Sequence, residues 1–402
     1  MVSAVLFITF FVLLVLNVPI AVCLGLSSAA AILYSGTSLT IVATNIYSGI
    51  SKFLLLAIPF FVLSGNIMAK AGISTRLIRF VDTCVGHRKG GIANVCIIVA
   101  CFFGAISGSG PATVAALGAV LIPAMVERGG FSAAFSTALM ATSSSIAIVI
   151  PPSIAFVVYA SITGVSIGDM FMAGIIPGIL MGLALVVVVM LEVRRNHVMP
   201  SNVEKASAKE RWNAFKDAFW GFLMPIIILG GIYGGFFTPT EAAAVSVVYG
   251  LFVGMVIYKE VKFKDLWEIL IDSAKTTGGI MLIVACASLF SFVCTRFGIS
   301  TAASELLARV AGNQFTFLLI CNIIFLIAGC FIDANSAMYI FIPIMLPVCK
   351  ALGYNVIAFG IMATVNLAIG QVTPPVGVNL FVAIGIKLRD GIRVTLQEIS
   401  RA

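Results

Sequence analysis

Long apolar runs separated by short polar loops dominate this sequence of 402 residues. The runs are continuous rather than alternating, and a helix needs about 20 apolar residues to cross a hydrocarbon core of about 30 Å. A membrane β-barrel would instead require short strands of alternating polarity. The sequence therefore predicts an all-α polytopic membrane protein of the inner-membrane type.

Four of the apolar runs differ from simple spanning helices. The segments 92–126 and 315–348 each contain a polar, helix-breaking tip, so we predict that they are helical hairpins. The segments 129–168 and 351–386 each carry a polar patch and a pair of prolines in their middle, so we predict that they are broken transmembrane helices.

These segments divide the chain into four predicted parts. In order, they are N-terminal scaffold helices with a cytoplasmic arm (1–91), a first transport repeat (92–191), a cytoplasmic connector with scaffold helices (192–314) and a second transport repeat (315–402). In the third part, the segments 212–220 and 265–277 are amphipathic. They are compatible either with helices at the level of the lipid headgroups or with ordinary connecting loops.

Composition agrees with a lipid environment and excludes several classes of function. Hydrophobic residues make up 61% of the chain and charged residues 10%, whereas charged residues make up about a quarter of a soluble domain. The nine cysteines stand singly, and His87 and His197 are the only histidines. We therefore interpret the cysteines as small buried hydrophobic residues rather than as metal ligands or disulfides.

The net charge of +8 marks membrane topology, and we do not take it as a sign of nucleic-acid binding. Twenty of the 24 Lys and Arg residues lie in or beside five regions, at 64–91, 128, 192–218, 259–275 and after 386. The four others are Lys52, Arg296, Arg309 and Lys350. The positive-inside rule places the rich regions in the cytoplasm. The hairpin at 92–126 must then enter and leave from the cytoplasm and the hairpin at 315–348 from outside, so the two are re-entrant in opposite senses.

The two halves also resemble each other in sequence. GAISGSGPATVAA, which starts at Gly104, aligns with GCFIDANSAMYIF, which starts at Gly329. ATSSSIAIVIPPSIAF, from Ala141, aligns with ATVNLAIGQVTPPVGVNLF, from Ala363, so that the two proline pairs match. Because the first unit starts inside and the second outside, this is an inverted-topology repeat, which is typical of secondary transporters with a site near the membrane midplane.

The first hairpin tip, Ser107-Gly108-Ser109-Gly110, cannot continue a stable helix. Its backbone groups need a ligand, an ion or another helix as partners, because lipid offers none. The carbonyls at the end of the helix before the tip favour a cation, and the free amides of the helix after it favour an anion. We therefore predict that this one loop can hold both a cation and an anion, and the alternative is a kink at which small residues let helices pack closely.

The second tip, Asp333-Ala334-Asn335-Ser336, contains the only acidic side chain in the four core segments. An ionised carboxylate in apolar surroundings costs several kcal/mol unless it is paired. A sodium ion is its predicted partner, a proton is the rival, and a helix-capping role for Asp333 is the structural alternative.

The polar patches of the broken helices could complete an ion shell. Thr142 to Ser145 lie in the first patch and Asn366 to Thr373 in the second, although such hydroxyls often only bond back to the preceding turn. The prolines free backbone carbonyls up to four residues earlier, near Ala147 and Gly370. Gly329, just before the second tip, lets backbone come close.

The chain resembles the large membrane subunit of tripartite ATP-independent periplasmic (TRAP) transporters, within the broader ion transporter superfamily. GSGPATVAALGAVLIPAM, VIPPS and QVTPPVGVNLFVA carry the resemblance, which covers essentially the whole chain. It implies an elevator-type, sodium-driven importer of organic acids with a small four-helix membrane subunit and a periplasmic binding protein. The family continues into a further apolar helix where this sequence stops, so a final helix is expected to be missing.

The resemblance also implies roles for individual residues. The two tips would face the substrate, which assigns Ser107, Gly108, Ser109, Gly110, Asn335 and Ser336 to substrate binding. Sodium would lie between each tip and its broken helix, which assigns Ser107, Ser143 and Ser144 to one site and Gly329, Asp333, Gly370 and Thr373 to the other. Arg296 would lie near the docked binding protein. No GxxxxGK[ST] loop is present to bind ATP phosphates, so no ATP is expected as the energy source.

Three other functions remain compatible with the sequence. They are a proton-coupled carboxylate transporter, a channel and an intramembrane enzyme, the last of which lacks a nucleophile with an obvious base. The substrate is not determined, because dicarboxylates, sialic acid and keto acids are all carboxylates and the tips offer generic oxygens and amides.

Overall fold

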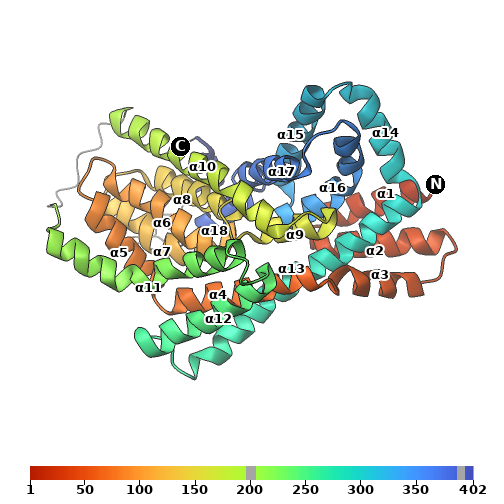
Figure 1. Cartoon of the computed structure of the whole chain (residues 1–402). Coiled ribbons are helices and arrows are strands. Elements are labelled where there is room, and N and C mark those ends of the chain that lie inside the picture. The colour runs from red at the N-terminus through yellow and green to blue at the C-terminus, as the bar shows by residue number, and fades with distance from the viewer. Residues whose placement is uncertain (196–204, 387–393, 402) are drawn as a thin grey trace.

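The computed structural model describes residues 1–195, 205–386 and 394–401, and in these ranges the regular structure is entirely helical. Three basic residues of the predicted last cytoplasmic region, Lys387, Arg389 and Arg393, lie outside the described residues, as does His197. Figure 1 shows α5 to α8 (residues 73–145) at one end of the molecule, and α1 to α3 (2–50) with α14 to α16 (299–351) at the other.

The N-terminal helices precede the first hairpin. They are α1 (Val2–Val15), α2 (Ile20–Tyr34), α3 (Thr40–Ile50), the short 3₁₀ helix η1 (Phe53–Leu56), α4 (Ala57–Lys70) and α5 (Ile73–Val85). The helices between the first broken helix and the second hairpin are α10 (Ile167–Arg195), α11 (Ala208–Tyr233), α12 (Pro239–Phe252) with the π-helical turn η3 (Val253–Ile257), α13 (Asp265–Arg296) and α14 (Ile299–Ala311). A last short helix, α19, spans Leu396–Arg401.

Eight helical stretches of the described chain are long and apolar enough to cross a membrane. They are Phe53–Lys70, Gly110–Glu127, Ile167–Arg195, Ala208–Tyr233, Pro239–Ile257, Asp265–Arg296, Gln314–Phe331 and Ala334–Ala351. The prediction of an all-α, multi-pass membrane protein is thereby confirmed at this level.

Local signals explain where several of these helices begin. Ser207 and Glu210 form a capping box at the start of α11, and Thr238 and Glu241 form another at the start of α12. Each pair satisfies two backbone amides that the first helical turn leaves free. The amphipathic segments 212–220 and 265–277 lie in the first turns of α11 and α13, so both are helical rather than connecting loops.

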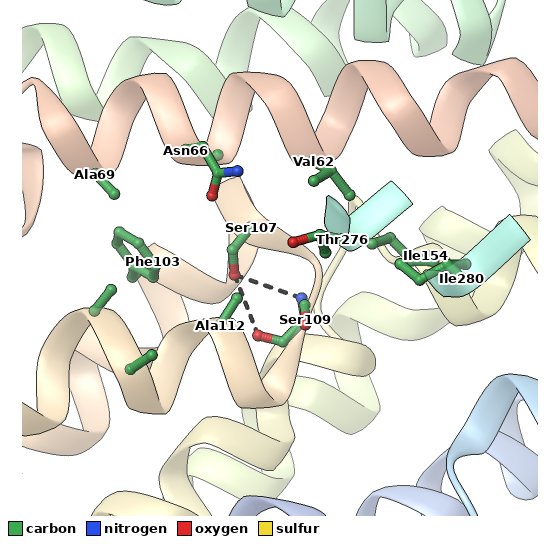
Figure 2. Close-up of a pocket in the computed structure, with 13 residues that line it drawn as sticks. Val62, Asn66, Ala69, Phe103, Ser107, Ser109, Ala112, Ile154, Thr276 and Ile280 are labelled. Atoms are coloured by element: carbon green, nitrogen blue, oxygen red, sulfur yellow. Dashed lines mark hydrogen bonds between the residues drawn. The ribbon is translucent and has the colours of Figure 1, made fainter. Parts of the chain in front are cut away.

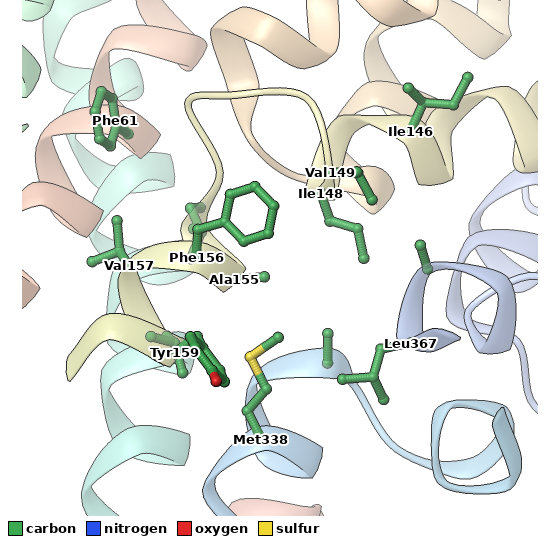
Figure 3. Packing of buried hydrophobic residues seen from close by; sticks show 14 of the residues in the cluster. Phe61, Ile146, Ile148, Val149, Ala155, Phe156, Val157, Tyr159, Met338 and Leu367 are labelled. Atoms are coloured by element: carbon green, nitrogen blue, oxygen red, sulfur yellow. The ribbon is translucent and has the colours of Figure 1, made fainter. Parts of the chain in front are cut away.

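The long helix α13 runs across the middle of the molecule (Figure 1). It packs against α2, α3 and α4 and also against α16, and Figure 1 shows it running diagonally across the molecule. Figure 3 shows the buried core beside it, where Phe156 and Tyr159 of α9 lie between Phe61 of α4 and Met338 of α16. Tyr159 donates a hydrogen bond to the carbonyl of Val356, 2.6 Å away.

A similarity that the sequence reasoning missed links α4–α5 to α13–α14. Each pair turns at Gly-Ile-Ser-Thr, starting at Gly72 and at Gly298, and both glycines have a left-handed backbone with φ of 68° and 70°. Glycine adopts this conformation without steric cost, so both helices can end and a new helix can begin at once. The resemblance between the halves thus extends upstream of the two hairpins.

Ion pairs connect the regions that are rich in Lys and Arg. Lys70 pairs with Glu268 at 3.0 Å and Arg79 with Asp217 at 3.5 Å. Two further pairs join Arg76 to Glu260 and Arg128 to Asp82. All four join different basic-rich regions that the sequence assigns to one side of the membrane.

Candidate functional site

The first hairpin consists of α6 (Gly91–Ser107) and α7 (Gly110–Glu127), joined by two residues. Gly108 turns the chain with a φ of 61°, and a methyl group added to it would lie 2.8 Å from the carbonyl oxygen of Pro152. The Ser107 hydroxyl lies 2.9 Å from that of Thr113 and accepts from the amide of Ser109 at 3.4 Å, as Figure 2 shows for Ser109. The polar groups of the tip therefore bond to one another, and Gly108 packs against the backbone of the first proline break.

The second hairpin consists of α15 (Gln314–Phe331) and α16 (Ala334–Ala351). Asp333 caps α16, because its carboxylate accepts from the amides of Asn335 at 3.0 Å and Ser336 at 3.2 Å, and also from the Ser336 hydroxyl. The Ser336 hydroxyl is therefore engaged with Asp333 rather than open to a substrate. The side-chain oxygen of Asn335 is buried and lacks a hydrogen-bond partner among the described residues.

The two broken helices have the same plan. The first consists of α8 (Ala133–Ser145), the 3₁₀ turn η2 (Ile146–Ile148) and α9 (Ile154–Thr163). The second consists of α17 (Val356–Gly370) and α18 (Val378–Ile384). Both breaks contain the Pro-Pro pair, at 151–152 and 374–375, and both Pro-Pro peptide bonds are cis.

Each hairpin touches its broken helix by direct backbone contact. A methyl group added to Gly329 would lie 2.9 Å from the Cα of Gly370, and one added to Gly104 would lie 2.7 Å from the Cα of Ala147. In both cases the contacted residue lies four positions before the first proline of its pair. Small residues are needed here because the two backbones pass each other in contact and leave no room for a side chain.

The two tips meet at a cavity of about 240 Å³. Gly108, Ser109 and Gly110 line it from the first hairpin, and Asp333 and Asn335 line it from the second. Gln371 of the second break and Thr276 of α13 complete the polar part of its wall. Segments more than 200 residues apart in the sequence thus contribute to one small chamber.

A second cavity of about 380 Å³ adjoins the first and lies between the first hairpin and the scaffold. The two share Ser109 and Thr276 as wall residues. Figure 2 shows Val62, Asn66 and Ala69 of α4 on one side of this cavity and Ser107 on the other. Most of its wall residues are apolar or small. Few bulky side chains therefore pack between the hairpin and the scaffold at this cavity.

The structure brings together most of the predicted site residues but not all of them. Ser143 and Ser144 lie apart from the first tip: the Ser143 side chain faces Cys96, about three helical turns before Ser107. The Ser144 hydroxyl donates to the carbonyl of Ala141 at 2.6 Å. Ser107 and these two hydroxyls therefore do not form one cluster, because the tip passes over the proline break and not over the serines.

The remaining predicted residues lie at the second crossing and at the surface. Thr373 follows Gly370 by one turn, and its hydroxyl donates to the carbonyl of Ile369 at 2.7 Å. Arg296 is exposed in the last turn of α13, at the end opposite to Lys70 and Glu268.

Three polar residues at or beside the cavity were not among the predicted site residues. Thr276 and Gln371 line it, and Asn379 lies next to Gly110, which lines it. Thr276 was not recognised because it belongs to a scaffold helix, and nothing in the sequence connects it to a tip. Gln371 lies within the polar patch that the sequence did identify. Asn379, at the start of α18, is the only polar side chain of the run from Val376 to Val382, and this could have drawn attention to it.

Comparison with known proteins identifies the family of this chain. A family model described as tripartite ATP-independent periplasmic transporter, DctM component, matches residues 7–401. The chain belongs to this family. The chain is similar to the C4-dicarboxylate TRAP transporter large permease protein DctM of Pseudomonas aeruginosa, which is 42% identical over 377 residues, 93% of this chain and 88% of the relative.

Other relatives are named for different substrates. The sialic acid TRAP transporter large permease protein SiaM of Vibrio cholerae is 36% identical over 354 residues, 88% of this chain and 82% of the relative. The isethionate TRAP transporter permease protein DctMQ of Oleidesulfovibrio alaskensis is 41% identical over 383 residues, 95% of this chain and 60% of the relative. These relatives are named as permeases, which implies a transporter rather than an intramembrane enzyme.

Proposed function

We propose that this TRAP component is a sodium-coupled importer subunit that carries an organic acid across the inner membrane of a bacterium by an elevator movement. The cavity between the two tips carries the proposal. It offers free backbone amides at the start of α7 and oxygens at the second tip, as an anion and an accompanying cation require. Relatives are named for C4-dicarboxylates, sialic acid and isethionate, which are all organic acids.

An inverted-topology repeat accounts for the packing on both sides of this cavity. In the first repeat α6 packs on α8, and in the second α15 packs on α17. Across the repeats, α9 packs on α16 and α18 packs on α7, so each hairpin contacts the far half of the other broken helix. Such exchanged contacts support one body that moves as a unit against α4 and α13.

Sodium is proposed to bind where each hairpin crosses its broken helix. At the second crossing the candidates are the backbone oxygens near Gly329 and Gly370, together with Thr373 and Asp333. At the first crossing the equivalent candidates are the backbone oxygens near Gly104 and Ala147. They take the place that the resemblance assigned to Ser143 and Ser144. Cations bound there would hold both tips against the cavity and so raise the affinity for the anion.

Two partner proteins are part of the proposal. They are a small four-helix membrane subunit and a periplasmic binding protein that delivers the substrate. The relative named DctMQ, of which this chain covers 60%, is consistent with a membrane partner fused to the large component. The exposed Arg296, beyond the apolar part of α13, is proposed to contact the binding protein.

Uptake in proteoliposomes tests the coupling. We expect that the full chain, reconstituted with its small subunit and loaded binding protein, accumulates a labelled organic acid only when a sodium gradient points inward, with ATP absent. Sodium should be required because hard oxygen donors suit this cation. Accumulation driven equally well by a proton gradient without sodium would assign proton coupling, and flux without accumulation would assign a channel.

Cysteine labelling tests the topology. We expect single cysteines at positions 88, 128 and 205 to react with a membrane-impermeant maleimide only after the cytoplasmic side is opened, and cysteines at 296 and 350 to react from outside. The ion pair between Arg128 and Asp82, at 2.9 Å, supports placing the end of α7 beside the cytoplasmic arm. Labelling of position 128 from outside would contradict the opposed hairpins and with them the inverted repeat.

A further inference from the structure

Two buried amide side chains of the second repeat face the start of α7 in the first. A methyl group added to Gly110 would lie 2.7 Å from Nδ2 and 2.9 Å from Oδ1 of Asn379, and 3.1 Å from Oε1 of Gln371. Asn379 is fully buried and Gln371 is 5% exposed. The two residues are also joined through the main chain, because the backbone amide of Asn379 donates to the backbone carbonyl of Gln371 at 3.1 Å.

These side chains lack the partners that buried amides need. In the described part of the chain, the Asn379 side chain has no hydrogen-bond partner for its nitrogen or its oxygen. The Gln371 side-chain oxygen has none either. The Asn335 side-chain oxygen, on the wall of the same cavity as Gln371, is unpartnered too. Each unsatisfied buried group carries an uncompensated desolvation cost, and a ligand that bonds to these groups removes it.

The start of α7 offers the complementary groups. The helix has 18 residues, and its first hydrogen bond to the tip runs from the amide of Thr113 to the carbonyl of Ser109. The amides of Gly110 and Ala112 have no partner among the described residues, and Pro111 has no amide hydrogen. This terminus, with the Asn379 amide nitrogen beside it, favours an anionic group.

Free donors and free acceptors in one place select a particular kind of organic acid. An acid group alone can accept from the amides of α7 and from Asn379, but it cannot donate to three amide oxygens. A hydroxyl group on the same molecule can donate to one of them. We therefore propose that Asn379 and Gln371 make this transporter specific for hydroxylated organic acids, with the acid group at the start of α7 and a hydroxyl at the amide oxygens.

This inference rests on the proposed function and names the substrate class of its site. A site built to bond a hydroxyl discriminates against the analogue that lacks it, because its own buried groups are then left unpaired. Asn379 and Gln371 also belong to a segment anchored to the second hairpin, since the amide of Val376 donates to the carbonyl of Cys330 at 3.1 Å. A substrate held here would contact both halves of the transport body.

Pairs of acids that differ in hydroxyl groups test the inference. The probes are malate and succinate, isethionate and ethanesulfonate, and gluconate and hexanoate. The full chain, co-purified with its small membrane subunit, is titrated with each probe, and binding is measured as a shift of thermal unfolding in sodium and in choline buffer. We expect at least one hydroxylated acid to bind more tightly than its partner by about tenfold or more, and Gln371→Met or Asn379→Leu to reduce that preference to within about twofold.

Asn366 provides the matched control. It is 5% exposed on α17, but its amide nitrogen donates to Oδ1 of Asn322 at 2.6 Å and so is already satisfied. Asn366→Met should lower the unfolding temperature without changing the preference for the hydroxylated acid. If Asn366→Met and Gln371→Met change that preference equally, the effect is a general loss of packing and the inference is wrong.

The remaining outcomes separate this inference from the proposed function. Equal, sodium-dependent binding of both members of every pair would overturn the specificity and leave the importer intact. A hydroxyl preference with acid affinities that are the same in sodium and choline would support the inference and remove the sodium coupling. Variants that shift only the sodium requirement would assign the amide oxygens to the cation, and no binding of any acid would overturn both proposals.

Discussion

Replacing Gly329 or Gly370 by alanine is expected to reduce uptake to less than about a tenth of the wild-type rate, because overpacking a tight contact displaces backbone. The added methyl group at Gly329 would lie 2.9 Å from the Cα of Gly370, and at Gly370 it would lie 2.5 Å from the Cα of Gly329. Backbone cannot rotate away as a side chain can, so the second tip must shift relative to its broken helix. The measurement is the initial rate of uptake in proteoliposomes, beside the unfolding temperature.

Glycines in open surroundings serve as controls. Gly278 and Gly279 of α13 and Gly230 of α11 have nothing within 4 Å of an added methyl group. Alanine at these positions should leave uptake near the wild-type rate, since it favours the helix by about 1 kcal/mol. Gly104→Ala, at the matching crossing of the first repeat, should behave like Gly329→Ala. Normal uptake in Gly329→Ala and Gly370→Ala would mean that close contact at this crossing is not needed for transport.

Asp333→Asn is expected to raise the sodium concentration required for half-maximal uptake by at least about tenfold, the factor that 1.4 kcal/mol of lost attraction produces. Asparagine caps a helix about as well as aspartate, so the two backbone bonds from Asn335 and Ser336 should persist and the protein should fold. Asp333→Ala removes the cap as well and should cost about 1 kcal/mol of stability in addition. Sodium dependence of uptake and thermal unfolding in detergent measure the two effects separately.

Asn355 is the matched cap. It starts α17 with the same geometry, accepting from the amides of Ile357 at 2.8 Å and Ala358 at 3.1 Å, and it lies outside both cavities. Asn355→Ala should therefore lower stability without changing the sodium requirement. Unchanged sodium dependence in Asp333→Asn would leave Asp333 with the capping role alone, and the second ion site would then depend on backbone oxygens near Gly329, Gly370 and Thr373.

Much of the fold was predictable because lipid imposes strong rules on sequence. The predicted hairpin at 315–348 contains α15 and α16, which break at Ile332–Asp333, and the segment 351–386 contains α17 and α18, which break around the prolines. Charged side chains are largely excluded from spanning helices, so they mark loops, and each break is marked by a Pro-Pro pair beside polar residues. A single proline is not such a mark, since Pro123 lies inside α7 and Pro177 inside α10. The amphipathic starts of α11 and α13 continue directly into the apolar parts of the same helices, which local polarity does not reveal.

The sequence by itself determined the helical class, the two polar tips and the two proline breaks, because each depends on residues that are neighbours along the chain. Only the tertiary structure decided which of these neighbours meet. It placed Gly104 against Ala147 rather than Ser107 against Ser143, engaged the Ser336 hydroxyl with Asp333, and brought Asn379 to Gly110 across the two repeats. Such contacts depend on how whole helices cross, and the crossing is set by packing over many residues that no short motif records.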